Sequence, residues 1–181
     1  MRTRIGILCS IPIEIRHFNL LENSFKEFGN KIFYKAKIDS REIIITQCGI
    51  GKVNAAIAST LLIQKFECSL IIFSGIAGGI DPELEIGDTI LGESLIQYDY
   101  GALKNEKIKL FRAGQIPLGN SKNVIEFSLN SEIKKMIKLK LPEIKMGKIL
   151  TADTYVNCIK TRENLFKKFG AQVVDMESAA V

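Results

Sequence analysis

Histidine and closely spaced cysteines are the residues that this sequence most lacks. Its one histidine is His17, and its four cysteines, Cys9, Cys48, Cys68 and Cys158, lie far apart in apolar runs. Structural zinc sites need several Cys and His ligands at short spacings, so a zinc site is not expected. We expect free, buried thiols in a reducing cytoplasm instead of disulfides, and His17 at the surface.

Long apolar runs and a concentrated basic stripe are also absent. The first apolar run ends at Glu14, without the small-residue cleavage site of a signal peptide, and no run reaches the length of about 18 residues that a membrane span needs. The net charge of +5, from 25 Lys and Arg against 20 Asp and Glu, is spread out apart from a mild lysine cluster over 134–140. A cytoplasmic protein is therefore expected, with neither a nucleic-acid nor a membrane partner.

Short apolar runs alternate with helical patterns along most of the chain. The expected elements are strands over 4–9, 70–74, 88–96, 145–150 and 172–174, a hairpin over 31–48, and helices over 12–29, 53–66, 124–139, 161–169 and from 177. The segment 98–123 is expected to be irregular and functional. The alternation predicts one domain over 1–181, a three-layer α/β/α fold with a central mixed sheet.

Polar or glycine-rich segments follow several of the expected strands. Glu14 follows the first strand, Cys48–Lys52 the hairpin, and Gly75–Gly79 the next strand, while Thr151–Asn157 and Asp175–Glu177 follow the last two. Ligands of open α/β sheets collect at the carboxyl ends of strands. These five segments are therefore expected to line one crevice.

The two glycine-rich segments match no nucleotide-binding fingerprint. The segment 49–52 lacks the first glycine and the Ser or Thr of a phosphate loop, and neither segment contains G-x-G-x-x-G. Two interpretations of 49–52 stay open, a tight strand-to-helix turn and a close approach of backbone to ligand. Over 75–79, backbone N–H groups can bind a polar ligand edge, although the apolar Ile76 disfavours phosphate.

Glu14 and Glu177 are the strongest polar candidates. Each follows an apolar strand, where partial desolvation makes a carboxylate a better base. A purely structural acid at a helix N-terminus is the alternative for both. Asp175 adds a second carboxylate beside Glu177, but no third and fourth metal ligands are evident, so no metal or cofactor is expected.

Seven stretches occur together in an order and spacing that belong to one known superfamily: Ile5-Gly-Ile7 with Glu14, Cys48–Lys52, Phe73–Gly79, Glu85–Asp88, Gly114–Pro117, Thr151–Tyr155 and Val174–Glu177. They resemble the purine nucleoside phosphorylase/uridine phosphorylase superfamily, and most of all its methylthioadenosine/S-adenosylhomocysteine nucleosidases. The resemblance implies a nucleoside phosphorylase-like fold, a homodimer with part of its interface over 98–123, and cleavage of the bond between ribose and adenine through an oxocarbenium-like transition state.

The resemblance also implies residue roles. Glu14 falls where the family activates water, Glu177 where it holds the ribose hydroxyls, Tyr155 where a ring stacks on adenine, and Ile50 where the 5′-alkylthio group is lined. The implied substrate-binding residues are Ile50, Ile76, Ala77, Gly78, Tyr155, Val156, Asp175, Met176 and Glu177. A glutamate in place of phosphate-binding groups favours hydrolysis, with release of adenine in methionine salvage.

By the same resemblance, family members continue beyond Val181 with a strand ending in Ser-Asp and a final helix. That aspartate is the family's proton donor, so the last strand and helix are expected to be missing here and catalysis to fall by about 10²–10⁴-fold. A fragment of a longer protein and a truncated gene product both remain open. So do two other functions: a catalytically dead nucleoside-binding or interaction protein, and a purine nucleosidase or phosphorylase of other specificity.

Overall fold

The structure, a computed structural model, describes residues 4–39, 41–118 and 125–181. The chain forms two compact units, each of which is described by itself. Unit 1 comprises Met1–Ile76 with Ala180–Val181, and unit 2 comprises Ala77–Ala179. The single domain over 1–181 stays a prediction.

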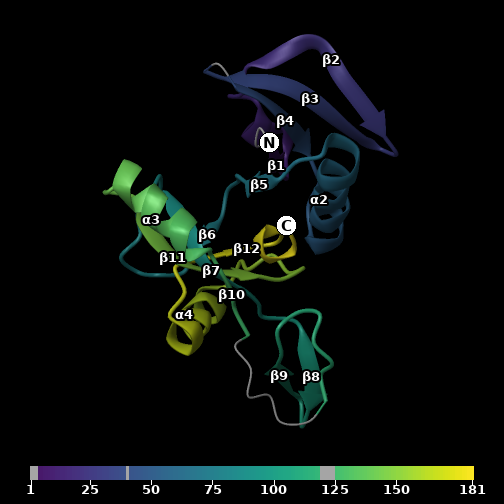
Figure 1. Ribbon diagram of the computed structural model, residues 1–181. Coiled ribbons are helices and arrows are strands. Elements are labelled where there is room, and N and C mark those ends of the chain that lie inside the picture. The colour runs from purple at the N-terminus through teal and green to yellow at the C-terminus, as the bar shows by residue number, and fades with distance from the viewer. Residues whose placement is uncertain (1–3, 40, 119–124) are drawn as a thin grey trace. The chain divides into compact units, whose positions relative to one another are not determined.

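Unit 1 is built on a mixed five-stranded sheet (Figure 1). In spatial order its strands are β2 (Leu20–Phe28), β3 (Lys31–Ile38), β4 (Arg41–Gln47), β1 (Ile5–Cys9) and β5 (Leu70–Phe73). The strand β1 is parallel to both β4 and β5, whereas β2, β3 and β4 form an antiparallel meander. These pairings confirm the expected strands over 4–9 and 70–74 and the expected hairpin over 31–48.

Side-chain alternation along β1 and β4 gives the unit-1 sheet two apolar faces. Leu8 and Ile44 belong to a buried cluster with α2 (Lys52–Phe66), a helix that packs on β1 and β4. On the other face, Ile7 and Ile45 join a second cluster beside the short helix α1 (Pro12–Ile15). The period of two in the strands thus places both helices.

The expected helix over 12–29 is wrong beyond Ile15. Residues Leu20–Phe28 form the strand β2, which pairs with β3 through a tight turn at Gly29, where φ is +62°. Phe25 lies opposite Tyr34 across the two strands, with ring centroids 6.3 Å apart. The apolar spacing of three and four residues suits a helix, but cross-strand aromatic pairing overrides it.

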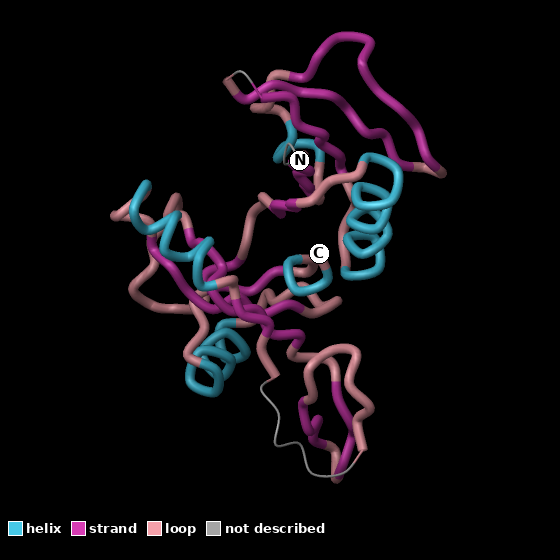
Figure 2. The backbone as a smooth tube through the Cα atoms, in the orientation of Figure 1, coloured by secondary structure: helices cyan, strands magenta, loops and turns pink. Residues whose placement is uncertain are grey.

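Unit 2 contains a second mixed five-stranded sheet, shown with its helices in Figure 2. In spatial order its strands are β10 (Phe127–Ser128), β7 (Ile90–Gln97), β11 (Lys145–Thr151), β12 (Val173–Asp175) and β6 (Gly78–Gly79). The strand β11 is parallel to β7 and β12. A buried cluster that includes Ile96, Leu150 and Val174 joins these strands to Leu165 of α4 (Ile159–Phe169). Mixed sheets with helices in both units confirm the α/β class.

Two further expectations in unit 2 need correction. The segment 98–123 is not wholly irregular, because β8 (Gly101–Lys104) and β9 (Lys107–Leu110) form a hairpin; residues 119–124 lie outside the described part. The helix expected from residue 124 is α3 (Ser131–Lys140), which begins after Asn130 because the side chain of Asn130 accepts hydrogen bonds from two backbone N–H groups. The last expected helix is a short 3-10 helix, η1 (Ser178–Ala180).

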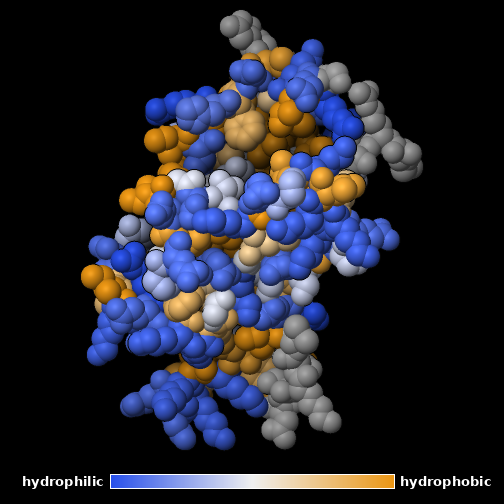
Figure 3. Space-filling view, turned by 90° about the vertical axis from the view of Figure 1, so that its left-hand side faces the viewer, coloured by the Kyte–Doolittle hydropathy of each residue, from blue (hydrophilic) through white to orange (hydrophobic). Residues whose placement is uncertain are grey.

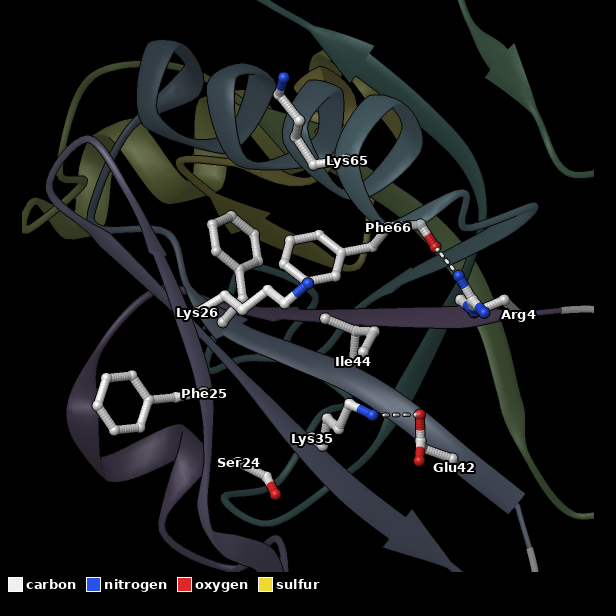
Figure 4. Close-up of a pocket in the computed structure, with 10 residues that line it drawn as sticks. Arg4, Ser24, Phe25, Lys26, Lys35, Glu42, Ile44, Lys65 and Phe66 are labelled. Atoms are coloured by element: carbon white, nitrogen blue, oxygen red, sulfur yellow. Dashed lines mark hydrogen bonds and ion pairs between the residues drawn. The ribbon is translucent and has the colours of Figure 1, made fainter.

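Hydrophilic residues dominate the face of the molecule seen in Figure 3, in line with the scattered charge of the sequence. A cavity of about 280 Å³ lies between the C-terminal end of α2 and the sheet, over the buried side chains of Phe33, Ile44 and Phe66 (Figure 4). Its lining includes Arg4 and Glu42 from the amino ends of β1 and β4. It is smaller than the roughly 300–1,000 Å³ of most ligand pockets and lies away from the strand ends where ligands collect.

No helix in the described part of the chain is long and apolar enough to cross a membrane.

Candidate functional site

The carboxyl ends of β1, β4 and β5 meet at one edge of the unit-1 sheet because the three strands are parallel. Backbone hydrogen bonds join the segments that follow them: Cys48 N–H donates to the Cys9 carbonyl at 2.8 Å, and Gly49 N–H donates to the Ser10 carbonyl at 3.2 Å. On the other side of β1, Ser74 N–H donates to the Leu8 carbonyl at 2.9 Å. Three of the five expected segments therefore lie side by side.

Glu14 is held at this edge by four hydrogen bonds. It occupies the third position of α1, a helix that Pro12 opens. Its Oε2 accepts from Ser10 N–H at 2.6 Å, from the Ser10 hydroxyl at 2.9 Å and from Ile11 N–H at 3.1 Å. Its Oε1 accepts from Ile76 N–H at 2.9 Å. The carboxylate is thus oriented by main-chain donors from the segment after β1 and from the loop after β5.

Gly75 lies directly beside this carboxylate. A Cβ atom at position 75 would lie 2.9 Å from Oε1 of Glu14, so any other residue would require the carboxylate to move from the position in which its four donors hold it. Among the described residues, Ile76 N–H is the one donor to Oε1, and a carboxylate oxygen has acceptor capacity for a second. Glu14 therefore contributes to the N-terminal cap of α1 and keeps capacity at Oε1 for one further hydrogen bond.

The segment 49–52 turns the chain from β4 into α2. Gly49 and Gly51 have φ values of +86° and +96°, which other residues rarely adopt, so the tight-turn interpretation is confirmed for both. Between them, the Ile50 side chain is 56% exposed, and the Ile50 carbonyl accepts from Asn54 Nδ2 at 2.8 Å. The turn presents an apolar side chain at the same edge as Glu14.

In unit 2, the ends of β11 and β12 are joined by buried hydroxyl and carboxylate groups. The Thr151 hydroxyl donates to Oδ1 of Asp175 at 2.6 Å, while Oδ2 accepts from the N–H of Ser178 at 3.2 Å and from its hydroxyl. Burial raises the pKa of Asp175 above its ordinary value of 3.8, and the hydrogen bonds from Ser178 and Thr151 oppose that rise. Asp175 thereby anchors the turn that leads into η1.

Glu177 lies in that turn and is 4% exposed. Its Oε2 accepts from Met176 N–H at 3.3 Å. Gly78 of β6 lies beside Val174 of β12, so the glycine-rich segment runs along the strand that leads to Glu177. Tyr155, by contrast, is 78% exposed.

The expected site residues are thus distributed over both units. Unit 1 holds Glu14, Ile50 and Ile76, and unit 2 holds Ala77, Gly78, Tyr155, Val156, Asp175, Met176 and Glu177. Their roles toward a substrate stay predictions. Within the described residues, no group of three or more His, Cys, Asp and Glu side chains is placed to hold a metal ion.

Three hydroxyl groups have roles in the structure that the sequence does not indicate, although Thr151 begins one of the expected segments. Ser10 binds Glu14, and Thr151 and Ser178 bind Asp175. The only sequence signal is a small hydroxyl residue next to a strand end. Of the cysteines, all free, Cys158 is exposed rather than buried because it precedes α4 at the surface. His17 is exposed, as expected.

Comparison with known proteins supplies the family. Residues 4–181 match the model of the Phosphorylase superfamily. The chain is 30% identical over 201 residues to the 5′-methylthioadenosine/S-adenosylhomocysteine nucleosidase of Mycobacterium bovis, with all of this chain and 79% of the relative covered.

Solved structures agree with that match. A mutant of the Helicobacter pylori nucleosidase with 5′-methylthioadenosine in its active site has a TM-score of 0.76 and 27% identity, covering 99% of this chain and 78% of the other. A futalosine hydrolase mutant of Helicobacter pylori has a TM-score of 0.77 and 26% identity, covering 99% and 81%. From its motifs, its fold and these matches, the chain belongs to the phosphorylase superfamily, in its branch of methylthioadenosine/S-adenosylhomocysteine nucleosidases.

Proposed function

We propose that this chain hydrolyses the N-glycosidic bond of 5′-methylthioadenosine and S-adenosylhomocysteine and releases adenine, a step of methionine salvage. The observation that carries the proposal is the geometry of Glu14. Its carboxylate is held by Ser10, Ile11 and Ile76 at the carboxyl ends of the unit-1 strands. The relatives of the chain include 5′-methylthioadenosine/S-adenosylhomocysteine nucleosidases.

The surroundings of Glu14 suit water better than phosphate as the attacking group. In the described part of the chain, its carboxylate bonds only backbone N–H groups and the Ser10 hydroxyl, with no Lys or Arg partner. A phosphate would meet a negative charge there with no cation to offset it. In the proposed step, the water oxygen bonds to C1′ while the C1′–N9 bond breaks. The water proton passes to Glu14, which returns it to solvent, and adenine leaves with the electron pair and takes up a proton from solvent.

The remaining site residues are assigned to binding. Glu177 holds the ribose hydroxyls, Met176 packs on the ribose, and Tyr155 stacks on adenine, whose edge meets the backbone of Val156. Asp175 shapes the turn that carries Met176 and Glu177. Ile50 lines the 5′-alkylthio group, and Ile76, Ala77 and Gly78 form the loop beside the nucleoside.

Product analysis tests the proposal. The purified chain is incubated with methylthioadenosine and with S-adenosylhomocysteine, with and without inorganic phosphate, and products are separated by chromatography. Free adenine and a free sugar, formed at the same rate without phosphate, are expected. A sugar 1-phosphate that appears only with phosphate contradicts hydrolysis, and tight substrate binding without adenine release supports the catalytically dead alternative.

Futalosine is a second candidate substrate, because the futalosine hydrolase structure resembles this chain as closely as the nucleosidase structure does, with TM-scores of 0.77 and 0.76. Competition assays separate the two. If futalosine is cleaved with a higher kcat/KM than methylthioadenosine, the substrate assignment changes while the hydrolytic chemistry stays.

Assembly and location complete the proposal. We expect a homodimer in which the segment 98–123, with its β8–β9 hairpin, forms part of the interface, and a cytoplasmic location with no cofactor. Light scattering on the purified chain tests the dimer, since a monomer at micromolar concentration contradicts it.

A further inference from the structure

Lys31, the first residue of β3, is a buried lysine. It is 6% exposed, and no carboxylate in the described part of the chain forms an ion pair with it. A buried ammonium group costs free energy unless hydrogen bonds replace its water. Its Nζ donates to the Cys48 carbonyl and to Oδ1 of Asn54, the latter at 3.2 Å. Both acceptors flank the turn that carries Ile50.

Asn54 extends this contact to Ile50 itself. Its Oδ1 accepts from Lys31, and its Nδ2 donates to the Ile50 carbonyl at 2.8 Å. Because the oxygen and the nitrogen of the amide each have one partner, the orientation of the side chain is set. The same amide lies against Gly49, where a Cβ atom would be 3.4 Å from its carbon. Lys31 and Asn54 therefore hold the turn from its hairpin side.

Within the turn, the Cys48 thiol donates to the Gly49 carbonyl at 3.1 Å, and Ala55 N–H donates to the Gly51 carbonyl at 3.1 Å. Gly49 and Gly51 lack side chains, and Ile50 is more than half exposed. On the side of β1, Cys48 and Gly49 N–H groups donate to the Cys9 and Ser10 carbonyls. Glu14 keeps its own four donors from Ser10, Ile11 and Ile76, and none of these is Lys31 or Asn54.

We propose that Lys31, acting through Asn54, is a positioning residue that fixes the Ile50 turn and so sets affinity for the 5′ substituent of the substrate. The proposal rests on the proposed function only for the identity of that substituent. Lys31 itself touches no reacting atom. Loss of its amine loosens one wall of the site and leaves the water-activating carboxylate in place.

Steady-state kinetics of Lys31→Met, which keeps the length of the side chain and removes its donors, test the proposal. The KM for methylthioadenosine is expected to rise about tenfold, the effect of losing one hydrogen bond to a charged group, while kcat stays within about twofold. The KM for adenosine, which has no alkylthio group, is expected to change little. Lys31→Arg retains a donor and should restore most of the affinity.

Asn54→Asp is the second variant, because it keeps the acceptor for Lys31 and removes the donor to Ile50, so it should raise KM in the same way. Lys26→Met, on the neighbouring strand β2 and exposed, is the matched control and should match the wild type. A parallel fall in kcat for every substrate, or an unchanged KM in a folded Lys31→Met, overturns the positioning role.

Hydrogen exchange separates this proposal from the proposed function. If the wild type cleaves no nucleoside, the backbone amides of 49–52 should still exchange faster in Lys31→Met and in Asn54→Asp than in Lys26→Met. Equal exchange in all three folded variants overturns the role of Lys31 whatever the activity. Faster exchange without turnover leaves the role intact and rejects the substrate assignment.

Discussion

At Glu14, both carboxylate oxygens accept hydrogen bonds from backbone N–H groups, so the side chain cannot be changed without consequences for its charge and its contacts. Glu14→Gln is expected to lower kcat by about 10²–10⁴-fold, because an amide cannot take the proton of water. Adenine release under saturating methylthioadenosine measures it.

The exposed Glu27→Gln on β2 is the control for that change and should keep the wild-type rate. A Glu14→Gln enzyme with wild-type kcat would remove Glu14 from the mechanism.

The thiols of Cys9, Cys68 and Cys158 should differ sharply in reactivity. Burial, followed by the charges of Glu14 and Cys48, raises the pKa of Cys9 to about 12, and burial raises the pKa of Cys68 as well. At the start of α4, the hydroxyl and N–H of Thr161 and the N–H of the residue before it lower the pKa of the exposed Cys158 below 9.0. Thiolates are the reactive form, so iodoacetamide at about pH 8 should modify Cys158 first.

Mass spectrometry of the native protein checks this order, with one added group per chain expected and none in Cys158→Ser. Early modification of Cys9 or Cys68 in folded protein would contradict it.

The sequence predicts the position of a residue well when that position follows directly from the order of residues along the chain. Glu14 follows a buried strand, and the structure places it at the strand ends beside Ile76. The donors that orient it, Ser10 and Ile11, were not foreseen because backbone hydrogen bonds leave no mark on residue type. Lys31 likewise carries no local signal, since its partners, Cys48 and Asn54, lie 17 and 23 residues away.

Among the elements, the expected strands and the helix α2 are confirmed, while the expected helix over 12–29 fails. Its apolar residues fit a helical period, yet Leu20–Phe28 forms a strand because β3 offers a partner across a two-residue turn. The local pattern of apolar residues does not show whether a partner strand is available. The hairpin of β8 and β9 was missed for a similar reason. Its turn residues Asn105 and Glu106 both adopt positive φ, and only one of them is a residue that commonly does so.

The junction of β12 with η1 should give the protein a pH-dependent stability. Burial raises the pKa of Asp175, so the folded state binds its proton more tightly than the unfolded state does. The contribution of this group to the free energy of unfolding is therefore largest below pH 3.8, its ordinary pKa, and falls as pH rises through the raised value.

Asp175→Asn removes that titration. Denaturant unfolding of both proteins across acidic to neutral pH should show the wild type losing stability relative to the variant as pH increases. A difference that stays constant with pH would mean that Asp175 is not shifted.

For the whole molecule, the sequence predicts the α/β class and mixed sheets but not the division of the strands into two five-stranded sheets. The strands β7 and β11 pair across a gap of about fifty residues, and β6 contains two glycines only. Pairings of this kind depend on tertiary packing that no local period encodes. The family resemblance, in contrast, is carried by motifs in order, and the family match over 4–181 confirms it.

Ligand binding should stabilise the whole chain if the proposed function holds. A hydrolysis-resistant methylthioadenosine analogue with carbon in place of N9, at 100 times its Kd, is expected to add about 2.7 kcal/mol, or roughly 5–10 °C in Tm. Thermal unfolding followed by circular dichroism measures the shift, and uridine at equal concentration should leave Tm unchanged. Equal shifts with both nucleosides would contradict adenine recognition.

The backbone N–H groups of Ile11 and Ile76, not their side chains, orient Glu14. The position of the Glu14 carboxylate should therefore not depend on which residue type occupies positions 11 and 76. Libraries that randomise positions 11 and 76 should retain many hydrolytic members, whereas substitutions at position 75 should lower activity by displacing the Glu14 carboxylate. If the proposed function holds, the nucleoside preference can therefore be changed through these neighbouring side chains without altering the carboxylate that is proposed to activate water.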